Sequence, residues 1–364
     1  MHYLDHASHS WPKPATVYQA LDDFAQPNSA KESSEIIQTA QQVLAELLHL
    51  PHPQHIQFMS SRAEALSLAL QRIDWQYGDG ILINALEHQD LLNAIMHLAR
   101  TRGVQVYIVP YSQFSPCDSR DWETVLQQYP NIRLIALSHA SNVIGCVFSV
   151  TAFSDLAQRY GKLFLLDASQ TAGFWPLNAQ RDNIDMLIFS GEKALHGPLG
   201  LSALYCSEDV RRGDDSPVKD LSLVSRIAGL TEGARWVHRY GKRQPIQALF
   251  SLLWSELDEI PEVQIYGMVE KTDQLPLLSF NVLGHHPEIL SKRLFQEFGI
   301  WLRTGFHHSR FAHESIGTIH RGGTLRASLG YSSKEEDILA LSQALKSILV
   351  ASSNHKAWDW VTNK

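Results

Sequence analysis

Two segments of the sequence end short apolar runs with residues that can do chemistry. The run Leu163–Leu166 ends at Asp167, and the run Met186–Phe189 ends at Ser190, with Lys193 shortly after it. Runs of this kind are typical of buried parallel strands, and open α/β sheets bind ligands at the carboxyl edge of their strands. We therefore expect a carboxylate and an amine to reach the same sheet edge from different strands.

Lys193 is a candidate for Schiff-base chemistry. A lysine beside buried apolar residues loses hydration, which lowers the pKa of its amine and makes it a nucleophile. Either residue taken alone also fits a plain structural role, with Asp167 as a helix cap and Lys193 as a surface charge.

Taken together, the two segments resemble the pyridoxal-phosphate enzymes of the class V aminotransferase family, in particular its cysteine desulfurase branch. That family has a strand ending Asp-x-x-Gln and then Ser-x-His-Lys-x-x-x-Gly-Pro-x-Gly. The resemblance implies that Lys193 forms the Schiff base with pyridoxal 5'-phosphate, that Asp167 pairs with the pyridine nitrogen and that Gln170 lies beside the ring hydroxyl. A carboxylate there keeps the nitrogen protonated, so the ring accepts electrons from the substrate α-carbon while the lysine amine moves the α-proton.

A polar turn before an apolar helix is a candidate anion site, because the N–H groups and dipole of a helix N-terminus favour negative charge. This turn resembles the family segment Ser-Gly-Ala-Thr-Glu-Ala, which holds the cofactor phosphate. The resemblance implies cofactor contacts by Ser190 and by the turn, which comprises Ser60, Ser61, Arg62 and Ala63.

The phosphate end departs from the family pattern. Ser61, Arg62 and Ala63 replace Gly, Ala and the phosphate-binding Thr, and Glu192 stands where the family has a phosphate-binding His. A carboxylate beside a phosphate is repelled strongly in a partly buried site unless a cation intervenes. We therefore expect Arg62 either to bridge Glu192 and the phosphate or to pair with Glu192 in a site that holds no phosphate.

Four further residues carry over from the resemblance. His88, which ends a Glu-His strand motif, would stack on the cofactor ring, and Asn142 would lie near the ring hydroxyl and the substrate. Arg326 matches the arginine that holds the substrate carboxylate, a task for which a bidentate guanidinium suits better than an amine. His308 takes the position of the family's nucleophilic cysteine, and no cysteine follows Cys206.

The missing thiol limits the expected reaction. Histidine cannot form the persulfide that a desulfurase makes on its cysteine. Chemistry of the C–S lyase or desulfurase-like kind remains open, as do transamination and epimerisation, with His307 or His308 as an acid toward the leaving group. A third alternative is a degenerate homologue that binds a partner without catalysis. We predict no metal site, because His307, His308 and His313 have no acidic or thiol ligand at a supporting spacing.

The alternation of strands and helices predicts the elements that position these residues. Over residues 55–205 it indicates a mainly parallel sheet, and over 263–350 a small α+β unit. The resemblance implies a fold-type I transferase with a seven-stranded sheet, divided into a large domain (14–245) and a small one (246–364 with the arm 1–13). The predicted strands are His55–Met59, Val104–Pro110, Ile132–Ser138, Val263–Tyr266 and Leu277–Val282, and the predicted helices Thr16–Phe24, Ser33–Leu50, Leu66–Gln71, Asp121–Tyr129, Leu221–Tyr240, Ile246–Leu257, Pro287–Phe298 and Ser333–Leu349.

The N-terminal stretch Tyr3–Pro12 is predicted to be an extended arm because prolines punctuate it. In the family this arm helps to close the substrate pocket, and a plain surface arm is the alternative. Residues 207–220 are predicted to be a loop. They lack the family's Arg-x-Gly-Thr-x-Asn motif, which weakens the homodimer that the resemblance implies.

Composition bounds the class of protein. The chain has 364 residues, a formal net charge of −7, 44% hydrophobic residues and 19% charged ones. This argues for an ordinary globular protein and against nucleic acid or an acidic membrane as its main partner. The small-molecule amino acid substrate is what the resemblance implies. The three cysteines, Cys117, Cys146 and Cys206, suggest no disulfide framework. With no signal peptide in view, we expect a cytoplasmic protein.

Overall fold

The computed structural model describes residues 1–24, 33–111, 118–210, 217–218, 220–241, 246–267 and 274–362, with side chains described as far as residue 351 and without that of Leu221. Cys117 and most of the predicted loop 207–220, namely residues 211–216 and 219, lie outside these ranges.

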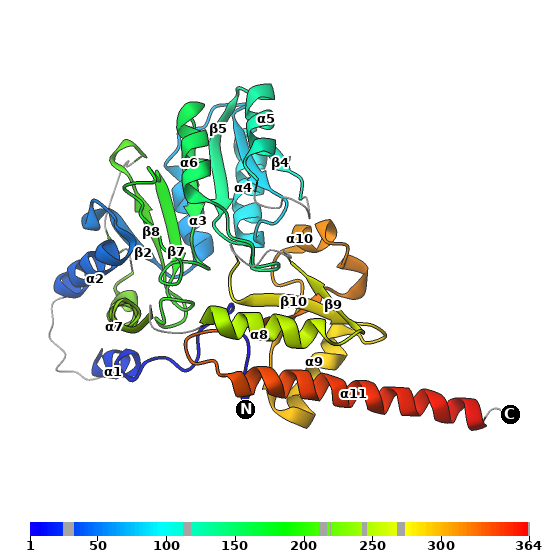
Figure 1. Ribbon diagram of the computed structural model, residues 1–364. Coiled ribbons are helices and arrows are strands. Elements are labelled where there is room, and N and C mark those ends of the chain that lie inside the picture. The colour runs from blue at the N-terminus through cyan, green and yellow to red at the C-terminus, as the bar shows by residue number, and fades with distance from the viewer. Residues whose placement is uncertain are drawn as a thin grey trace.

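A seven-stranded sheet forms the larger part of the molecule (Figure 1). Its strand order is β2-β8-β7-β6-β5-β3-β4, and all neighbours are parallel except those of β8, which runs antiparallel to both. The prediction of a mainly parallel seven-stranded sheet is therefore confirmed. The strands are β2 Ile56–Met59, β3 Gly80–Asn84, β4 Gln105–Val109, β5 Ile132–Ser138, β6 Leu163–Asp167, β7 Met186–Ser190 and β8 Ser202–Cys206.

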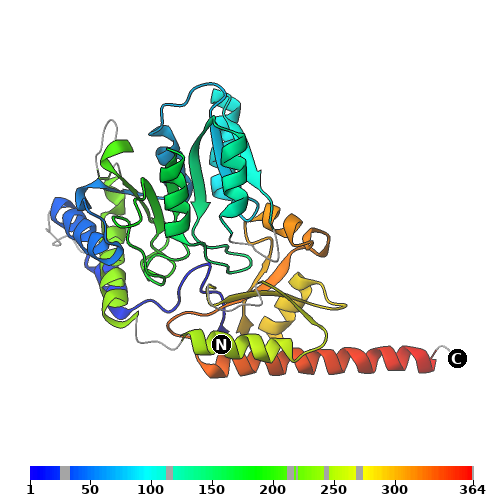
Figure 2. The same ribbon diagram turned by 45° about the horizontal axis from the view of Figure 1, so that its top comes forward.

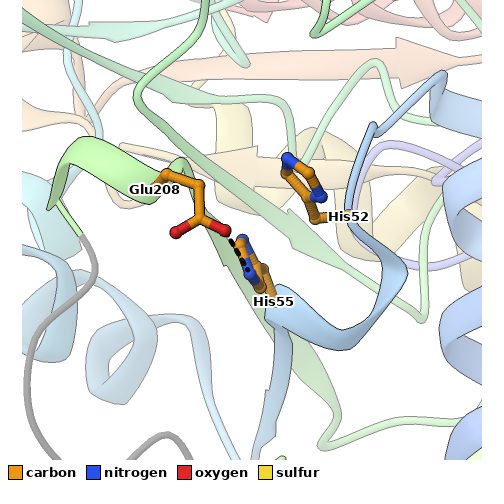
Figure 3. Close-up of side chains that lie close together, drawn as sticks. All are labelled: His52, His55 and Glu208. Atoms are coloured by element: carbon orange, nitrogen blue, oxygen red, sulfur yellow. Dashed lines mark ion pairs between the residues drawn. The ribbon is translucent and has the colours of Figure 1, made fainter.

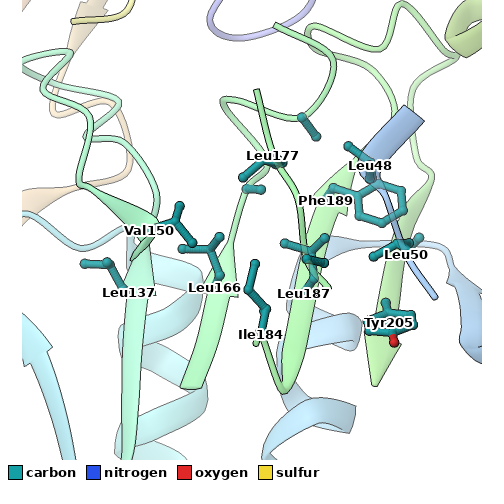
Figure 4. Close-up of a cluster of buried hydrophobic side chains, with 14 of the residues drawn as sticks. Leu48, Leu50, Leu137, Val150, Leu166, Leu177, Ile184, Leu187, Phe189 and Tyr205 are labelled. Atoms are coloured by element: carbon teal, nitrogen blue, oxygen red, sulfur yellow. The ribbon is translucent and has the colours of Figure 1, made fainter. Parts of the chain in front are cut away.

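Helices cover both faces of this sheet, which explains why its central strands are apolar on both sides. Successive residues of a strand point to opposite faces, so Leu165 packs with α3 and α4 while Leu166 packs on the other face with α2, α6 and α7. Figure 4 shows part of the core on the face that α2, α6 and α7 cover, with Leu166, Leu187 and Phe189 side by side. The helices are α1 Ala15–Phe24, α2 Ser33–Leu48, α3 Arg62–Gln71, α4 Gln89–Arg102, α5 Arg120–Gln128, α6 Val150–Arg159 and α7 Val224–Tyr240.

The remaining helices and strands form the small α+β unit that the sequence predicted. Its antiparallel sheet has the order β12-β13-β10-β9. In both ribbon views α8 and α11 lie side by side next to this sheet, and α11 projects beyond it (Figures 1 and 2). The elements are β9 Val263–Tyr266, β10 Leu277–Val282, β12 Arg303–Gly305, β13 Thr324–Ser328, α8 Ile246–Asp258, α9 Pro287–Phe298, α10 Arg310–Ser315 and α11 Glu335–Thr362.

The N-terminal arm joins this small unit. Strand β1 (His2–Tyr3) pairs in parallel with β11 (Ile300–Trp301), and Leu4 is buried in the core that α8, α9 and α11 share. His2 also contacts Asp337 of α11 at 2.8 Å. These contacts support the assignment of the arm to the small domain, and the domain boundaries themselves stay a prediction.

Most predicted elements have the expected bounds, and two differ. Helix α3 begins at Arg62, ahead of the predicted Leu66, because Ser61 Oγ caps its start by accepting from Glu64 N–H. Helix α11 continues to Thr362, well beyond the predicted end at Leu349. Among the described residues no helix combines the length and the apolar character that crossing a bilayer requires.

Candidate active site

Five strand ends bring the predicted site residues to one edge of the large sheet. Asp167 ends β6 and Ser190 ends the parallel strand β7 beside it. His88 follows β3, Asn142 follows β5 and Ser60 follows β2, so the parallel strands deliver all of them to the carboxyl edge. A cavity of about 360 Å³ lies there. Its lining includes Ser60, Ser61, Arg62, His88, Asn142, Gln170, Ser190, Lys193, His308 and Arg326.

Lys193 reaches the cavity from the turn after β7. Burial, and after it the nearby positive charge of Arg62, lower the pKa of its amine to about 8, while the charges of Glu192 and Asp167 oppose this shift. The turn is tight: Gly197 N–H donates to Gly191 at 2.8 Å, and a Cβ on Gly197 would meet Leu230 at 2.8 Å. The sequence-based expectation of a desolvated lysine beside a carboxylate is thus met by the geometry.

Arg62 has a different partner from the one that the phosphate-site argument predicted. Its Nε donates to Asp167 Oδ2 at 2.5 Å, and its Nη2 forms an ion pair with the same oxygen at 2.5 Å. The expectation that Arg62 contacts Glu192 is therefore wrong. The physical reason is burial, because the Asp167 side chain is only 1% exposed and a buried carboxylate needs a cation far more than a partly exposed one does.

Glu192 faces a cation from the N-terminal arm instead. Lys13 Nζ donates to the backbone oxygen of Glu192 at 2.6 Å and to Ser10 Oγ at 2.9 Å. Burial lowers the pKa of Lys13 to about 8, and the charge of Glu192 opposes this shift. Lys13, a residue the sequence did not single out, therefore lies close enough to Glu192 for their charges to interact.

The phosphate end offers a capped helix start. Ser61 Oγ accepts from Glu64 N–H at 3.2 Å, and the Glu64 carboxylate accepts from Ser60 N–H at 3.1 Å and from its hydroxyl at 2.8 Å. Ser60, Ser61 and Arg62 line the cavity, whereas Ala63 does not appear in its lining. The hydroxyl of Ser190 is held between Ser169 and Ser202, at 3.2 Å from each.

His88 and His308 lie against each other on one side of the cavity. Their ring centroids are 5.8 Å apart and the rings are 30° from parallel. His88 caps α4 by accepting from Asp90 N–H at 3.1 Å, and burial lowers the pKa of its imidazole well below the usual range. A neutral ring fixed in this way suits the stacking role that the resemblance implies.

The turn that carries His308 is held by Asn142. The Asn142 amide donates to the His307 carbonyl at 2.6 Å and accepts from Ser309 Oγ at 2.8 Å. His307 and His308 both have left-handed backbone, with φ of 49° and 57°. Both the nitrogen and the oxygen of the Asn142 amide are thus hydrogen-bonded to this turn, although Asn142 also lines the cavity. Burial lowers the pKa of His307 well below its usual value, which argues against the proton-donor role considered for it.

Arg326 is buried and positioned by the N-terminal arm. Its Nη1 donates to the Asn142 carbonyl at 2.8 Å, and its Nη2 donates to Asp5 Oδ1 at 3.1 Å and to Ser8 Oγ at 3.0 Å. Gln170 also contacts the arm, donating to the Ala7 carbonyl at 3.2 Å. The arm therefore closes one side of the cavity, as the resemblance implied, and is not a plain surface segment.

Two charged groups near the cavity were missed from the sequence. Arg303 of β12 lines the cavity with its Nη2 3.5 Å from His308 Nε2. The sequence contained a signal for Arg303, because Arg303 and Gly305 precede His308 with the spacing of the family's Arg-x-Gly-x-x-Cys pattern. Glu87, the residue before His88, is fully buried. Its carboxylate accepts from Ser138 N–H at 3.0 Å and from the Asn84 amide at 2.6 Å. Burial raises the pKa of Glu87 to about 7.

These residues fit pyridoxal phosphate. Lys193 would supply a desolvated amine for the aldehyde, Asp167 a buried carboxylate for the ring nitrogen and His88 a neutral ring to stack. The start of α3 would supply the positive end of a helix dipole for the phosphate, beside the guanidinium of Arg62, which is paired with Asp167. The Nε of Arg326 has no hydrogen-bond partner among the described residues, as expected of a group that awaits an anion.

Comparison with known proteins agrees with this geometry. A protein of Methanothermobacter thermautotrophicus named probable cysteine desulfurase is 26% identical over 384 residues, which cover 95% of this chain and 94% of that protein. The cysteine desulfurase of Pectobacterium atrosepticum is 25% identical over 388 residues, covering 95% of this chain and 92% of that one.

Solved structures have the same fold. The cysteine desulfurase CsdA from Escherichia coli, at 25% identity, superposes with a TM-score of 0.83 and covers 96% of this chain and 94% of its own. The cystine C–S lyase C-DES, in complex with its product cysteine persulfide, has a TM-score of 0.79 at 22% identity and covers 94% of this chain and 97% of its own, which shows a shared fold.

The chain also matches the family Aminotransferase class-V over residues 2–216 and 222–341. This match spans nearly the whole length and includes both sheets and the cavity between the strand ends and the arm. The chain therefore belongs to the class V aminotransferase family, is a cysteine desulfurase-like enzyme within it, and has pyridoxal phosphate as its cofactor.

Proposed function

We propose that this enzyme acts at the α-carbon of a sulfur-containing amino acid, by C–S lyase or desulfurase-like chemistry that does not use the family's persulfide cysteine. The observation that carries the proposal is the cavity in which the amine of Lys193, the guanidinium of Arg326 and the imidazole of His308 face one space. The relatives named cysteine desulfurases support a sulfur amino acid as substrate.

Each residue has a task in this proposal. Lys193 holds the cofactor and, with its pKa near 8, takes or returns the α-proton close to neutral pH. Asp167 would pair with the ring nitrogen, and His88 would stack on the ring. Bound pyridoxal phosphate supplies an electron sink for the α-carbon.

Arg326 binds the substrate carboxylate in a bidentate manner, since its planar guanidinium is oriented by Asp5 and by the Asn142 carbonyl. Arg303 adds a second positive charge at the mouth of the same space. The carboxylate of a substrate that enters the cavity is therefore drawn toward the small unit. The side chain of the substrate is then directed toward His308.

His308 is the residue beside the leaving group. It stands where the family has its nucleophilic cysteine, so sulfur leaves to solvent and is not taken up by the protein. Its imidazole lies against His88, and its Nε2 is 3.5 Å from Arg303 Nη2, so the ring is held on the side of the cavity toward which the substrate side chain would point. The homodimer and the cytoplasmic location stay predictions.

The test is an absorbance spectrum of the purified holoenzyme before and after L-cysteine or L-cystine, together with assays for pyruvate and sulfide. Release of pyruvate supports elimination. Conversion to the pyridoxamine form, without pyruvate, would establish transamination in its place, and racemised substrate would establish epimerisation. Lys193→Ala should abolish the visible imine band, while Lys292→Ala, at an exposed position of α9, should keep it. A wild-type chain without any imine band would overturn the proposal.

A further inference from the structure

A group of three metal-ligating side chains lies outside the cavity. His52 precedes the short 3₁₀ helix η1 (Pro53–His55), His55 ends it, and Glu208 begins the 3₁₀ helix η2 (Glu208–Val210). Figure 3 shows the Glu208 carboxylate directed at His55, with the His52 imidazole beside this pair. The ligand atoms of these three side chains lie close enough together to hold one ion. Within the described parts of the chain, no other group of three or more His, Cys, Asp and Glu side chains does so.

The distances suit a four-coordinate ion. All three ligand atoms lie within 4.8 Å of one another, and His55 Nε2 is 3.5 Å from Glu208 Oε1. Two ligands bound to Zn²⁺ at its usual distances and tetrahedral angle are about 3.4 Å apart. The pair His55 and Glu208 therefore already has the separation of two zinc ligands. The less buried His52 ring lies against His55, with centroids 4.8 Å apart and planes 34° apart, and completes the set when it turns a ring nitrogen toward the pair.

The orientation of His55 is fixed by a contact behind it. Its Nδ1 lies 3.1 Å from the Cys206 carbonyl, to which it donates, so the lone pair of Nε2 points at Glu208. Metal-binding histidines are typically held by this kind of hydrogen bond from the second ring nitrogen to a backbone carbonyl. The His55 side chain is 1% exposed, which keeps the ring in this position.

The sheet keeps the two halves of the group together. His55 directly precedes β2 and Glu208 closely follows β8, and these strands pair antiparallel with Ile56 opposite Tyr205. This places the group at the end of β2 that is far from Ser60, hence at the sheet edge opposite the cavity. Occupation of the group is therefore independent of the cofactor and of the proposed reaction.

We propose that His52, His55 and Glu208 bind a divalent transition-metal ion of the Zn²⁺ class, with water in the remaining position. Two imidazoles and one carboxylate are a ligand set that Zn²⁺ takes and that Mg²⁺ or Ca²⁺ does not prefer. The bound ion joins the entry of β2 to the exit of β8, and its role is structural. The alternative is a simple ion pair between His55 and Glu208, which needs no metal and makes no use of His52.

The test is isothermal titration of the EDTA-dialysed, pyridoxal-phosphate-loaded full chain with Zn²⁺, repeated with Co²⁺ and followed by absorbance. We expect one tight equivalent, visible d–d bands of a four- or five-coordinate ion without a thiolate charge-transfer band, and a higher Tm with Zn²⁺. Glu208→Gln and His52→Ala should each weaken binding by at least about tenfold, the loss that even an outer-shell change produces. Both positions are more exposed than His55, so these variants should fold.

Two matched controls separate this site from general metal affinity. Asp209→Asn removes the exposed acid next to Glu208, and His97→Ala removes an exposed histidine of α4, and both should bind as the wild type does. Equal Zn²⁺ affinity in the wild type, Glu208→Gln and His52→Ala would overturn the proposal, as would the absence of a tight equivalent. A thiolate band in the Co²⁺ spectrum would assign the ion to a cysteine and overturn it as well.

Discussion

Arg62 and Asp167 form a buried ion pair in which both Nε and Nη2 of the guanidinium lie 2.5 Å from one carboxylate oxygen, and Nε donates a hydrogen bond to it. The carboxylate that the family uses for the ring nitrogen therefore has a cation of its own. Its second oxygen accepts from Ser169 N–H at 3.0 Å. This pairing links the start of α3 to the end of β6, so one residue of the phosphate turn sets the charge around the cofactor ring.

The first prediction concerns this pair. Arg62→Ala leaves the Asp167 carboxylate buried without its cation, so the cofactor-free chain should lose about 3 kcal/mol of unfolding free energy. The loss should be smaller with pyridoxal phosphate bound, because the ring nitrogen then gives Asp167 another partner. Urea unfolding with and without the cofactor measures both values. Arg310→Ala is the control, since its exposed pair with Glu314 is worth about 0.5 kcal/mol or less.

The second prediction follows from the lowered pKa of Lys193. The folded chain releases this proton at a pKa of about 8, whereas an unfolded lysine holds it to about 10.4. The unfolded state thus binds more protons between these values, so the stability of the cofactor-free chain should rise with pH across the window from 8 to 10.4. Lys193→Met should remove a rise of at most about 3 kcal/mol. Equal slopes of unfolding free energy against pH in the wild type and the variant would contradict the lowered pKa of Lys193.

The sequence was sufficient to predict the sheet and the edge that holds the site. Asp167 and Ser190 end apolar runs that could only be buried strands, and the parallel order then brings them together. The sequence was not sufficient to predict the partner of Arg62, because Arg62 and Asp167 are 105 residues apart and no local spacing indicates their contact. The preference of Arg62 for Asp167 over Glu192 depends on relative burial, which only the packed structure contains.

The same limit applies to the residues that hold Arg326 and to the metal-ligand group. Asp5 reaches Arg326 because β1 pairs with β11 and carries the arm past β13, a pairing of two-residue strands that periodicity does not reveal. The His52-x-x-His55 spacing is visible in the sequence. Glu208 joins it only through the pairing of β2 with β8.

The third prediction concerns Glu87, whose pKa burial raises to about 7. Between pH 4.5 and 7 the folded chain holds a proton that the unfolded chain releases, so Glu87 destabilises the fold as the pH rises through this window. Glu87→Gln stays neutral and keeps an oxygen for Ser138 N–H and Asn84, so it should raise the unfolding free energy above pH 7 and change it little near pH 4.5. Exposed Glu314→Gln is the control. A loss of stability in Glu87→Gln at pH 8 would contradict the prediction.

The fourth prediction concerns Asp5 as a positioning residue for Arg326. Asp5→Asn keeps the size of the side chain but removes the charge that orients the guanidinium, so KM for the amino acid should rise by about tenfold while kcat changes little. Arg326→Lys loses the bidentate contact itself and should lower kcat/KM by about a hundredfold. Steady-state kinetics separates the two effects. A fall in kcat without a change in KM for Asp5→Asn would place Asp5 in the chemistry and not in binding.

The last prediction restores a thiol at the position of His308. The turn there is held by Asn142 and keeps left-handed backbone, and its side chain faces the cavity beside His88. His308→Cys should therefore place a thiolate where it can attack the sulfur of L-cysteine, so that an S–S bond forms while the C–S bond breaks and its electron pair stays with the carbon skeleton, which is released as alanine after protonation. Treatment with L-cysteine should then leave a persulfide on that side chain, detected by alkylation and mass spectrometry, together with an equivalent of alanine. Ser309→Cys, one residue on, has its side chain turned to Asn142 and should gain none. If His308→Cys releases free sulfide at the wild-type rate and carries no persulfide, then this turn does not lie on the path of the sulfur, and the assignment of His308 to the leaving group fails.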